Sequence, residues 1–309
     1  MLKALNELEG LIQKDMFMPV AVAGAESATV LGAVDRAARI NAVMPLLIGS
    51  EERMKAAAEL AQVDLGRYER INSDSDEETA NIAARLASQD TVKCIMKGTL
   101  ETSTLLKAYL NKEYGLRGDN ILSHTTAFEI PAYDKLLFMT DGALNPVVNL
   151  EIKKAILNNC LGILRTLGYD RIYAAALSFA EHSDGKTLSL LDAAELKHCA
   201  EAGEFGEDVI LEGPIAFDLA ISVRAAKEKG YVSPVAGKAD ILLVPALEVG
   251  NAIGKSFTYF GNAKNAGVIA GGKVPIALNS RSANLIDKYN TLVLGLFAAM
   301  IKGKEAENV

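Results

Sequence analysis

The stretch PVAVAGAESATVLGAVDRAARINAVMPLLIG, residues 19–49, decides the fold class. Residues 19–25 form a short apolar run without polar alternation, as expected of a strand buried on both faces. A helical pattern follows over residues 27–42, with Ser27 placed to cap it, and residues 45–49 form a second buried-type strand. This strand–helix–strand order predicts parallel strands whose sheet is covered by helices on both faces.

The same alternation continues along the rest of the chain, with one interruption. Composition changes at residues 115–120, and two strands then follow in succession, which predicts a hairpin and a mixed sheet. The predicted strands are 70–73, 92–98, 122–130, 135–140, 171–178, 208–211, 241–245 and a last strand ending at 278. The predicted helices are 51–63, 76–88, 102–114, 150–167, 187–204, 218–229, 250–261 and 282–302.

Bulk properties exclude several classes of protein. A chain of 309 residues suits two domains, and a net charge of −7 argues against a nucleic-acid-binding surface. Residues 1–15 predict an amphipathic helix, not a signal peptide, and no apolar run is long enough to span a membrane. Cys94, Cys160 and Cys199 lie far apart without a CxxC pair, so we expect no disulfide or zinc site, and a reducing cytoplasm.

A hydroxyl, a guanidinium and a carboxylate gather at one strand-to-helix junction. Residues 273–289 read KVPIALNSRSANLIDKY, in which an apolar strand ends just before Ser280 and Arg281, and Asp287 lies on the following helix. Ligands of open α/β sheets collect at such strand ends. A guanidinium fork beside a carboxylate base suits an anionic acyl donor.

This segment resembles the C-terminal signature of the phosphate acetyl/butyryl transferases, or phosphotransacylases, in its Ser-Arg pair and in the Asp six residues after the Arg. Residues 235–251, VAGKADILLVPALEVGN, are similar to the family pattern VAGxA(D/N)xLxxPxxxxGN. Residues 212–218, EGPIAFD, resemble a family DGPLxxD segment, with Glu212 where Asp is usual. The pieces MKG at 96–98 and SH at 123–124 are closer to the butyryl branch than to the acetyl branch.

The resemblance implies two three-layer α/β/α domains with a cleft between them, the second inserted into the first, as in isocitrate and isopropylmalate dehydrogenases. Carried over to this chain, the first domain is 1–117 plus 271–309, and the inserted domain is 118–270. The active site is then expected in the cleft. A homodimer or higher homo-oligomer is implied by the family alone.

The resemblance also implies catalytic roles. Arg281 would hold the phosphate, Ser280 would donate a hydrogen bond to the substrate, and Asp287 would be the base that takes the thiol proton of coenzyme A. From the residues alone, Ser280 or Ser282 is a turn or helix-cap residue and Asp287 is a solvated helix residue. No GxSxG elbow is present, so Ser280 is not interpreted as a covalent nucleophile.

Further residues are predicted to bind the substrate. They are Lys97, Gly98, Thr99, Lys107, Gly250, Asn251 and Lys255. The first three form a strand-to-helix junction that suits phosphate, although helix capping by Thr99 or Thr102 is the plainer interpretation. Lys107 lies one residue out of step with an Arg of the acetyl branch. The last three belong to the GN motif or closely follow it.

The function implied by the resemblance is an acyltransferase that interconverts short-chain acyl-CoA and phosphate with acyl phosphate and CoA, by direct transfer in a ternary complex. Coenzyme A is a substrate there, and no metal or redox cofactor is needed. Two alternatives stay open: a catalytically silent homologue that binds CoA or regulates, and an oxidoreductase like the β-decarboxylating dehydrogenases. The sequence shows no GxGxxG fingerprint or aspartate cluster for the latter. Acyl chain length also stays open.

Overall fold

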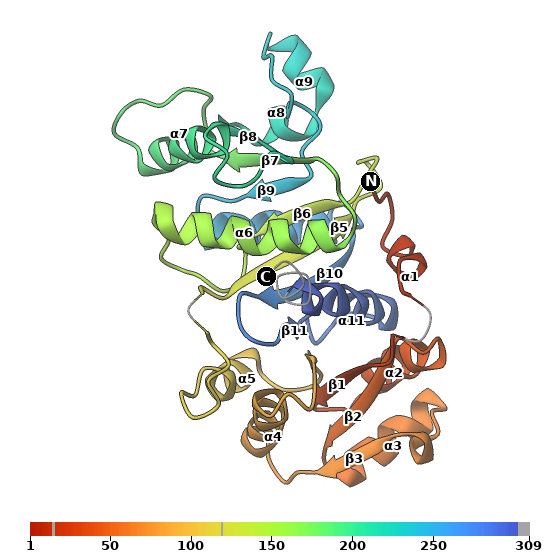
Figure 1. Ribbon diagram of the computed structural model, residues 1–309. Coiled ribbons are helices and arrows are strands. Elements are labelled where there is room, and N and C mark those ends of the chain that lie inside the picture. Colours follow the sequence, from red (N-terminus) through yellow and green to blue (C-terminus); the bar gives the residue numbers. More distant parts are fainter. Residues whose placement is uncertain (14–15, 119, 302–309) are drawn as a thin grey trace. The chain divides into compact units, whose positions relative to one another are not determined.

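The structure is a computed structural model that describes residues 1–13, 16–118 and 120–301 (Figure 1). Its internal contacts divide the chain into two compact units. The terminal unit comprises Asn6–Asn120 and Ala266–Val309, and the middle unit comprises Met1–Leu5 and Ile121–Asn265. Both units mix helices with a sheet, so the predicted α/β class is confirmed. The inserted-domain boundaries drawn from the family resemblance stay a prediction.

The strands of the terminal unit lie in the order β3-β2-β1-β4-β11-β10. They are β1 (Met18–Ala23), β2 (Val43–Gly49), β3 (Glu69–Asn72), β4 (Cys94–Lys97), β10 (Lys264–Ala270) and β11 (Ile276–Ala277). All neighbouring pairs are parallel except β10 and β11, which are antiparallel. Val20–Ala23 of β1 has no exposed surface, as its unbroken apolar run predicts for a central strand.

Helices cover both faces of this sheet. They are α1 (Glu7–Gly10), α2 (Ala28–Arg39), α3 (Glu51–Ala61), α4 (Asp76–Ser88), α5 (Thr102–Tyr109) and α11 (Leu285–Ala299). A 3₁₀ turn at Leu65–Arg67 precedes β3. The chain adds β2 and β3 on one side of β1 and then returns to add β4 on the other. Right-handed crossovers therefore put α2 and α3 on one face and α4 on the opposite face. α11 packs against α2, and α5 packs against α4.

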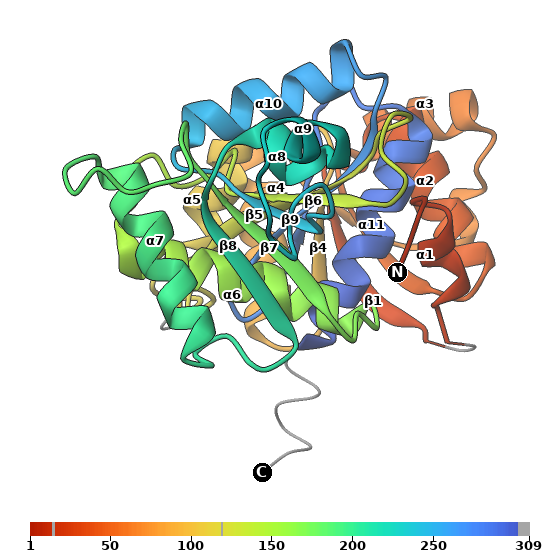
Figure 2. The same ribbon diagram turned by 90° about the horizontal axis from the view of Figure 1, so that it is seen from above.

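The strands of the middle unit lie in the order β5-β6-β9-β7-β8. They are β5 (Ser123–Glu129), β6 (Leu137–Thr140), β7 (Ile172–Leu177), β8 (Val209–Ile215) and β9 (Ile241–Leu243). β5 and β6 form the predicted antiparallel hairpin, and the other pairs are parallel. The helices are α6 (Leu150–Thr166), α7 (Leu188–Glu201), α8 (Phe217–Ile221), α9 (Val223–Glu228) and α10 (Leu247–Tyr259). Figure 2 shows α10 and α8 on one side of these strands and α6 on the other.

The structure differs from the predicted elements in several places, of which three lie outside the candidate site. β10 was not predicted, because Gly267 and Gly271 resemble turn residues, yet the strand is buried from Ala266 to Ala270. The predicted helix 218–229 is divided at Ser222, whose extended backbone interrupts it and whose side chain caps α9. At the N-terminus the helix is only Glu7–Gly10, and residues 14–15 of the predicted one lie outside the described residues.

Candidate active site

The carboxyl ends of β1, β4 and β11 lie side by side in the terminal unit, because the three strands are parallel neighbours. β1 pairs with β4 and β4 pairs with β11, all in parallel. The direction in which the chain adds strands reverses between β1 and β4. Ligands of open α/β sheets bind at such a switch point, outside the carboxyl ends of the strands.

The loops that follow β1 and β4 touch through their backbones. A Cβ added at Gly98 would lie 2.0 Å from the carbonyl oxygen of Gly24, so only glycine fits there. The Thr99 N–H donates to that carbonyl oxygen at 3.0 Å, and Gly24 has a φ of +81°. Gly98 and Thr99 therefore join two loops, and the predicted helix-capping role of Thr99 is wrong because α5 is preceded by Glu101.

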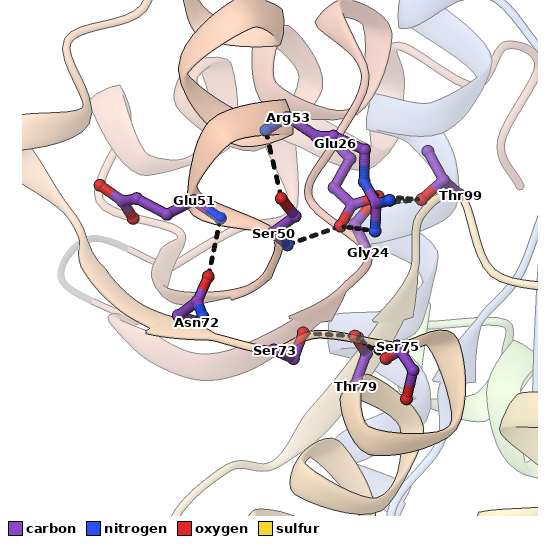
Figure 3. Close-up of polar contacts among 10 residues, drawn as sticks. All are labelled: Gly24, Glu26, Ser50, Glu51, Arg53, Asn72, Ser73, Ser75, Thr79 and Thr99. Carbon is purple, nitrogen blue, oxygen red and sulfur yellow. Dashed lines mark hydrogen bonds and ion pairs between the residues drawn. The ribbon is translucent and has the colours of Figure 1, made fainter.

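Glu26 extends this connection to the loop after β2 (Figure 3). Its carboxylate accepts the backbone N–H of Ser50 at 2.6 Å and forms an ion pair with Arg53 at 2.8 Å. The Thr99 hydroxyl lies 3.4 Å from the same carboxylate. Only 8% of the Glu26 side chain is exposed, and these donors compensate its burial.

Lys97 ends β4 with a buried ammonium group. Its Nζ donates to the carbonyl oxygen of Leu100 at 2.8 Å and to that of Gly98 at 3.4 Å, and 6% of the residue is exposed. The pKa of Lys97 is lowered to about 8, first by burial and then by the positive charges of Lys288 and Arg281. Several cations therefore share the region beyond β4 and β11.

Ser280 and Arg281 lie on the exposed segment between β11 and α11. The Ser280 N–H donates to Asn279 Oδ1 at 2.7 Å, and the hydroxyls of Ser280 and Ser282 are 2.9 Å apart. The Arg281 guanidinium forms an ion pair with Glu101, the residue just before α5. More than half of each of these two side chains is exposed, so an anion from solvent has access to the guanidinium.

α11 begins three residues later than predicted, which places Asp287 in its first turn. Asn284, not Ser282, caps the helix: its Oδ1 accepts the Asp287 N–H at 2.9 Å, and its Nδ2 donates to the Asp287 carboxylate at 3.0 Å. The Asn284 side chain thus caps the helix through one atom and hydrogen-bonds the Asp287 side chain through the other. Asp287 is only 8% exposed, so the interpretation of it as a solvated helix residue is wrong.

Lys288 follows Asp287 and points beneath the same loop. It is 4% exposed, and its Nζ lies 3.1 Å from the carbonyl oxygen of Ser280 and 3.5 Å from that of Arg281. Burial lowers the pKa of Lys288, and the negative charge of Asp287 opposes this effect. The buried ammonium group of Lys288 thus holds the backbone of the segment that carries Ser280 and Arg281.

Comparison with known proteins identifies the family. A family model described as Phosphate acetyl/butaryl transferase matches residues 76–296, which include the strand ends and loops described above from β4 onward. The chain belongs to the phosphate acetyl/butyryl transferase family.

Individual relatives cover nearly the whole chain. A phosphate acetyltransferase of Rickettsia prowazekii is 37% identical over 291 residues, which is 93% of this chain and 82% of that protein. A probable phosphate butyryltransferase of Bacillus subtilis is 38% identical over 295 residues, covering 96% and 98%. The crystal structure of a branched-chain phosphotransacylase from Enterococcus faecalis V583 is 29% identical, with a TM-score of 0.78 over 92% of this chain and 99% of that chain.

In this phosphotransacylase family member, the residues predicted to bind substrate do not all lie together. Lys97, Gly98 and Thr99 lie at the same sheet edge as the Ser280–Asp287 segment. Lys107 lies further along α5, where it lines a pocket of about 590 Å³ between α4 and α5. The pocket is lined by Glu77, Asn81, Ser103, Thr104, Lys107, Ala108 and Asn111.

The remaining predicted residues of the phosphotransacylase site lie on α10 of the middle unit. The helix begins at Leu247, earlier than predicted, so Gly250 lies inside it. A Cβ at Gly250 would approach Gly142 Cα to 2.7 Å, and Asn251 Nδ2 lies 3.5 Å from the Gly142 carbonyl oxygen. The GN motif therefore packs α10 onto the turn after β6, while Lys255 is exposed.

Sequence reasoning missed three charged residues of this phosphotransacylase: Glu26, Glu101 and Lys288. The carboxylates follow β1 and β4 at the strand ends, and that placement is the only sequence signal for them. Lys288 has no such signal, because a lysine next to an acid on a helix is ordinarily a surface residue.

Two other findings bear on the sequence predictions. Among residues 1–13, 16–118 and 120–301, no group of three or more His, Cys, Asp or Glu side chains could hold a metal ion. Within the same described ranges, no helix is both long enough and apolar enough to cross a membrane.

Proposed function

We propose that this chain transfers a short acyl group between coenzyme A and phosphate. The observation that carries the proposal is that Lys97 and Arg281 follow two adjacent parallel strands, β4 and β11, with Asp287 in the first turn of the next helix, all in the range matched by the family. Relatives over nearly the whole chain bear the names phosphate acetyltransferase and phosphate butyryltransferase, which support the same reaction.

In the proposed mechanism the acyl group passes directly from one substrate to the other. Asp287 accepts the proton of the CoA thiol, whose unperturbed pKa is about 8.5 or higher. The sulfur then bonds to the carbonyl carbon of the acyl phosphate, and the bond from that carbon to the phosphate oxygen breaks. Arg281 holds the departing phosphate with paired N–H donors, and Ser280 donates a hydrogen bond to the substrate oxygen.

One observation favours the alternative of a catalytically silent homologue. The Asp287 carboxylate already accepts a hydrogen bond from the side chain of Asn284, which caps α11, so it has a structural role without any substrate. That bond and a role as base are compatible, because a carboxylate has two oxygens and room for several donors. A direct assay of turnover decides between the two functions.

The deciding experiment measures release of the CoA thiol in the presence of phosphate and a series of acyl-CoAs from C2 to C8. We expect phosphate-dependent release, and arsenate should replace phosphate because its acyl ester hydrolyses spontaneously. Absence of thiol release with every acyl-CoA, in protein shown to be folded by circular dichroism, would contradict the proposed transfer.

Gly250, Asn251, Lys255 and Lys107 are proposed substrate contacts, coenzyme A is proposed as substrate with no further cofactor, and a homodimer in the cytoplasm is proposed. The three cysteines are free and buried, which supports a reducing environment.

A further inference from the structure

Lys288 is unusual among lysines because it is buried. Lysine is almost never fully buried without a charged partner, because removing an ammonium group from water is costly. The hydrogen-bond acceptors of Lys288 Nζ are the carbonyl oxygens of Ser280 and Arg281, and Asp287 is the negative charge that offsets its burial in part. The ammonium is thus held beneath the loop proposed to bind phosphate.

Lys288 is not the only cation buried there. Lys97 has a similar environment, with carbonyl oxygens as acceptors, and the charge of Lys288 is the second cause of its lowered pKa, after burial. Arg281 adds a third positive charge, and Glu101 and Asp287 are the carboxylates that face the group. Three positive charges and two carboxylates leave an excess of positive charge, which suits the binding of an oxyanion.

We propose that Lys288 is a positioning residue of the phosphate site, which holds the Ser280–Arg281 segment by its carbonyl oxygens and adds a positive charge beneath it. This inference rests on the proposed function and deepens it. Its ligand is the oxyanion shared by inorganic phosphate and the phosphoryl group of an acyl phosphate.

Lys288 contacts one side of the Ser280–Arg281 segment, and the oxyanion is proposed to bind on the other side. In a trans peptide the carbonyl and the N–H of the next residue point in opposite directions. When Lys288 holds the Ser280 carbonyl, the Arg281 N–H is turned away from Lys288. A backbone donor and the guanidinium of Arg281 then belong to the same residue, and both are available for one oxyanion.

The test replaces Lys288 by Met, Gln and Arg. Met removes the charge and the donors, Gln keeps a donor without the charge, and Arg keeps both. We expect Lys288→Met and Lys288→Gln to raise the KM for phosphate by roughly tenfold or more, the scale of losing one charged hydrogen bond. The KM for acyl-CoA should stay within about twofold, and Lys288→Arg should restore much of the phosphate affinity.

The matched control is Lys153→Met. Lys153 is a lysine of the middle unit with 5% exposure, whose Nζ pairs with Asp192 at 2.8 Å. Its replacement should lower the thermal midpoint without a selective change in the KM for phosphate. As a readout independent of turnover, added phosphate should raise the thermal midpoint of the wild type more than that of Lys288→Met.

Each outcome decides the inference. A KM for phosphate within twofold of wild type in Lys288→Met, or an equal rise for both substrates, would overturn it while leaving the proposed function intact. If Lys288→Met does not fold, the comparison of Lys288→Gln with Lys288→Arg decides by the same criterion. Absence of thiol release in the wild type removes the proposed function itself. In that case, a thermal midpoint that phosphate raises in the wild type but not in Lys288→Gln still supports the anion site.

Discussion

Arg281 and Asp287 lie on one loop–helix segment but in opposite surroundings. The Arg281 side chain is 58% exposed and the Asp287 residue is 8% exposed, with its backbone and carboxylate engaged by Asn284. An exposed guanidinium suits the capture of an anion, whereas a buried, oriented carboxylate suits proton transfer. The two residues are therefore expected to fail differently when changed.

We expect Arg281→Ala to lower both phosphate affinity and turnover, with a rate loss of about 10²–10³.

Asp287→Asn keeps a side-chain partner for Asn284 but cannot take the thiol proton, so kcat should fall by about 10²–10⁴ with KM values nearly unchanged. Between pH 6 and 9 the fraction of CoA thiolate rises, which should partly rescue Asp287→Asn and not Arg281→Ala. The measurement is CoA consumption with acyl phosphate across this range. A near wild-type kcat of Asp287→Asn at pH 7 would show that the Asp287 carboxylate is not the base.

In the proposed mechanism, Glu101 competes with phosphate for Arg281. Its ion pair with the guanidinium has to open or shift before an oxyanion takes paired N–H donors. Both side chains are exposed by more than half, and exposed pairs contribute about 0.2–1 kcal/mol. We therefore expect Glu101→Gln to lower the KM for phosphate by up to about fivefold, measured by thiol release. A raised KM would mean instead that Glu101 orients the guanidinium for its ligand.

Among the secondary structure elements, the contact between the loops after β1 and β4 depends on one glycine. We expect Gly98→Ala to push the Gly24 carbonyl away, because its Cβ would otherwise lie 2.0 Å from that oxygen. The thermal midpoint and the phosphate affinity should both fall, since Lys97 donates to carbonyl oxygens of this loop. The control is Gly10→Ala in α1, where an added Cβ meets no atom within 4 Å. If Gly98→Ala leaves both quantities at wild-type values, the loop contact does not position the site.

Considered as a whole, the molecule belongs to a family in which acetyl and butyryl transferases occur together. Relatives with both names lie at similar identity, 37% and 38%, so identity does not decide the acyl chain length. We expect butyryl-CoA or branched C4–C5 acyl-CoA to be preferred, from the pieces at residues 96–98 and 123–124 that resemble the butyryl branch. The measurement is kcat/KM for each acyl-CoA. A tenfold preference for acetyl-CoA would reverse this assignment.

The sequence by itself determined the class of fold, the β5–β6 hairpin and the segment that carries Ser280, Arg281 and Asp287. It could do so because apolar periodicity and short motifs are local, and strands or caps formed within about twenty residues leave their pattern in the chain. The same locality explains its errors. β10 contains Gly267 in a buried run, and glycine is ordinarily a sign of a turn. Ser282 and Asn284 are both able to cap α11, and the structure uses Asn284.

Only the tertiary structure decided which loops meet. Glu101 and Arg281 are separated by 180 residues, and they pair because β4 and β11 become parallel neighbours in the sheet. The order of strands depends on packing between distant segments, which no local pattern encodes. Burial is decided in the same way. Nothing local in the sequence marks Lys97 or Lys288 as buried, and it is the packing of distant loops around them that removes their ammonium groups from water.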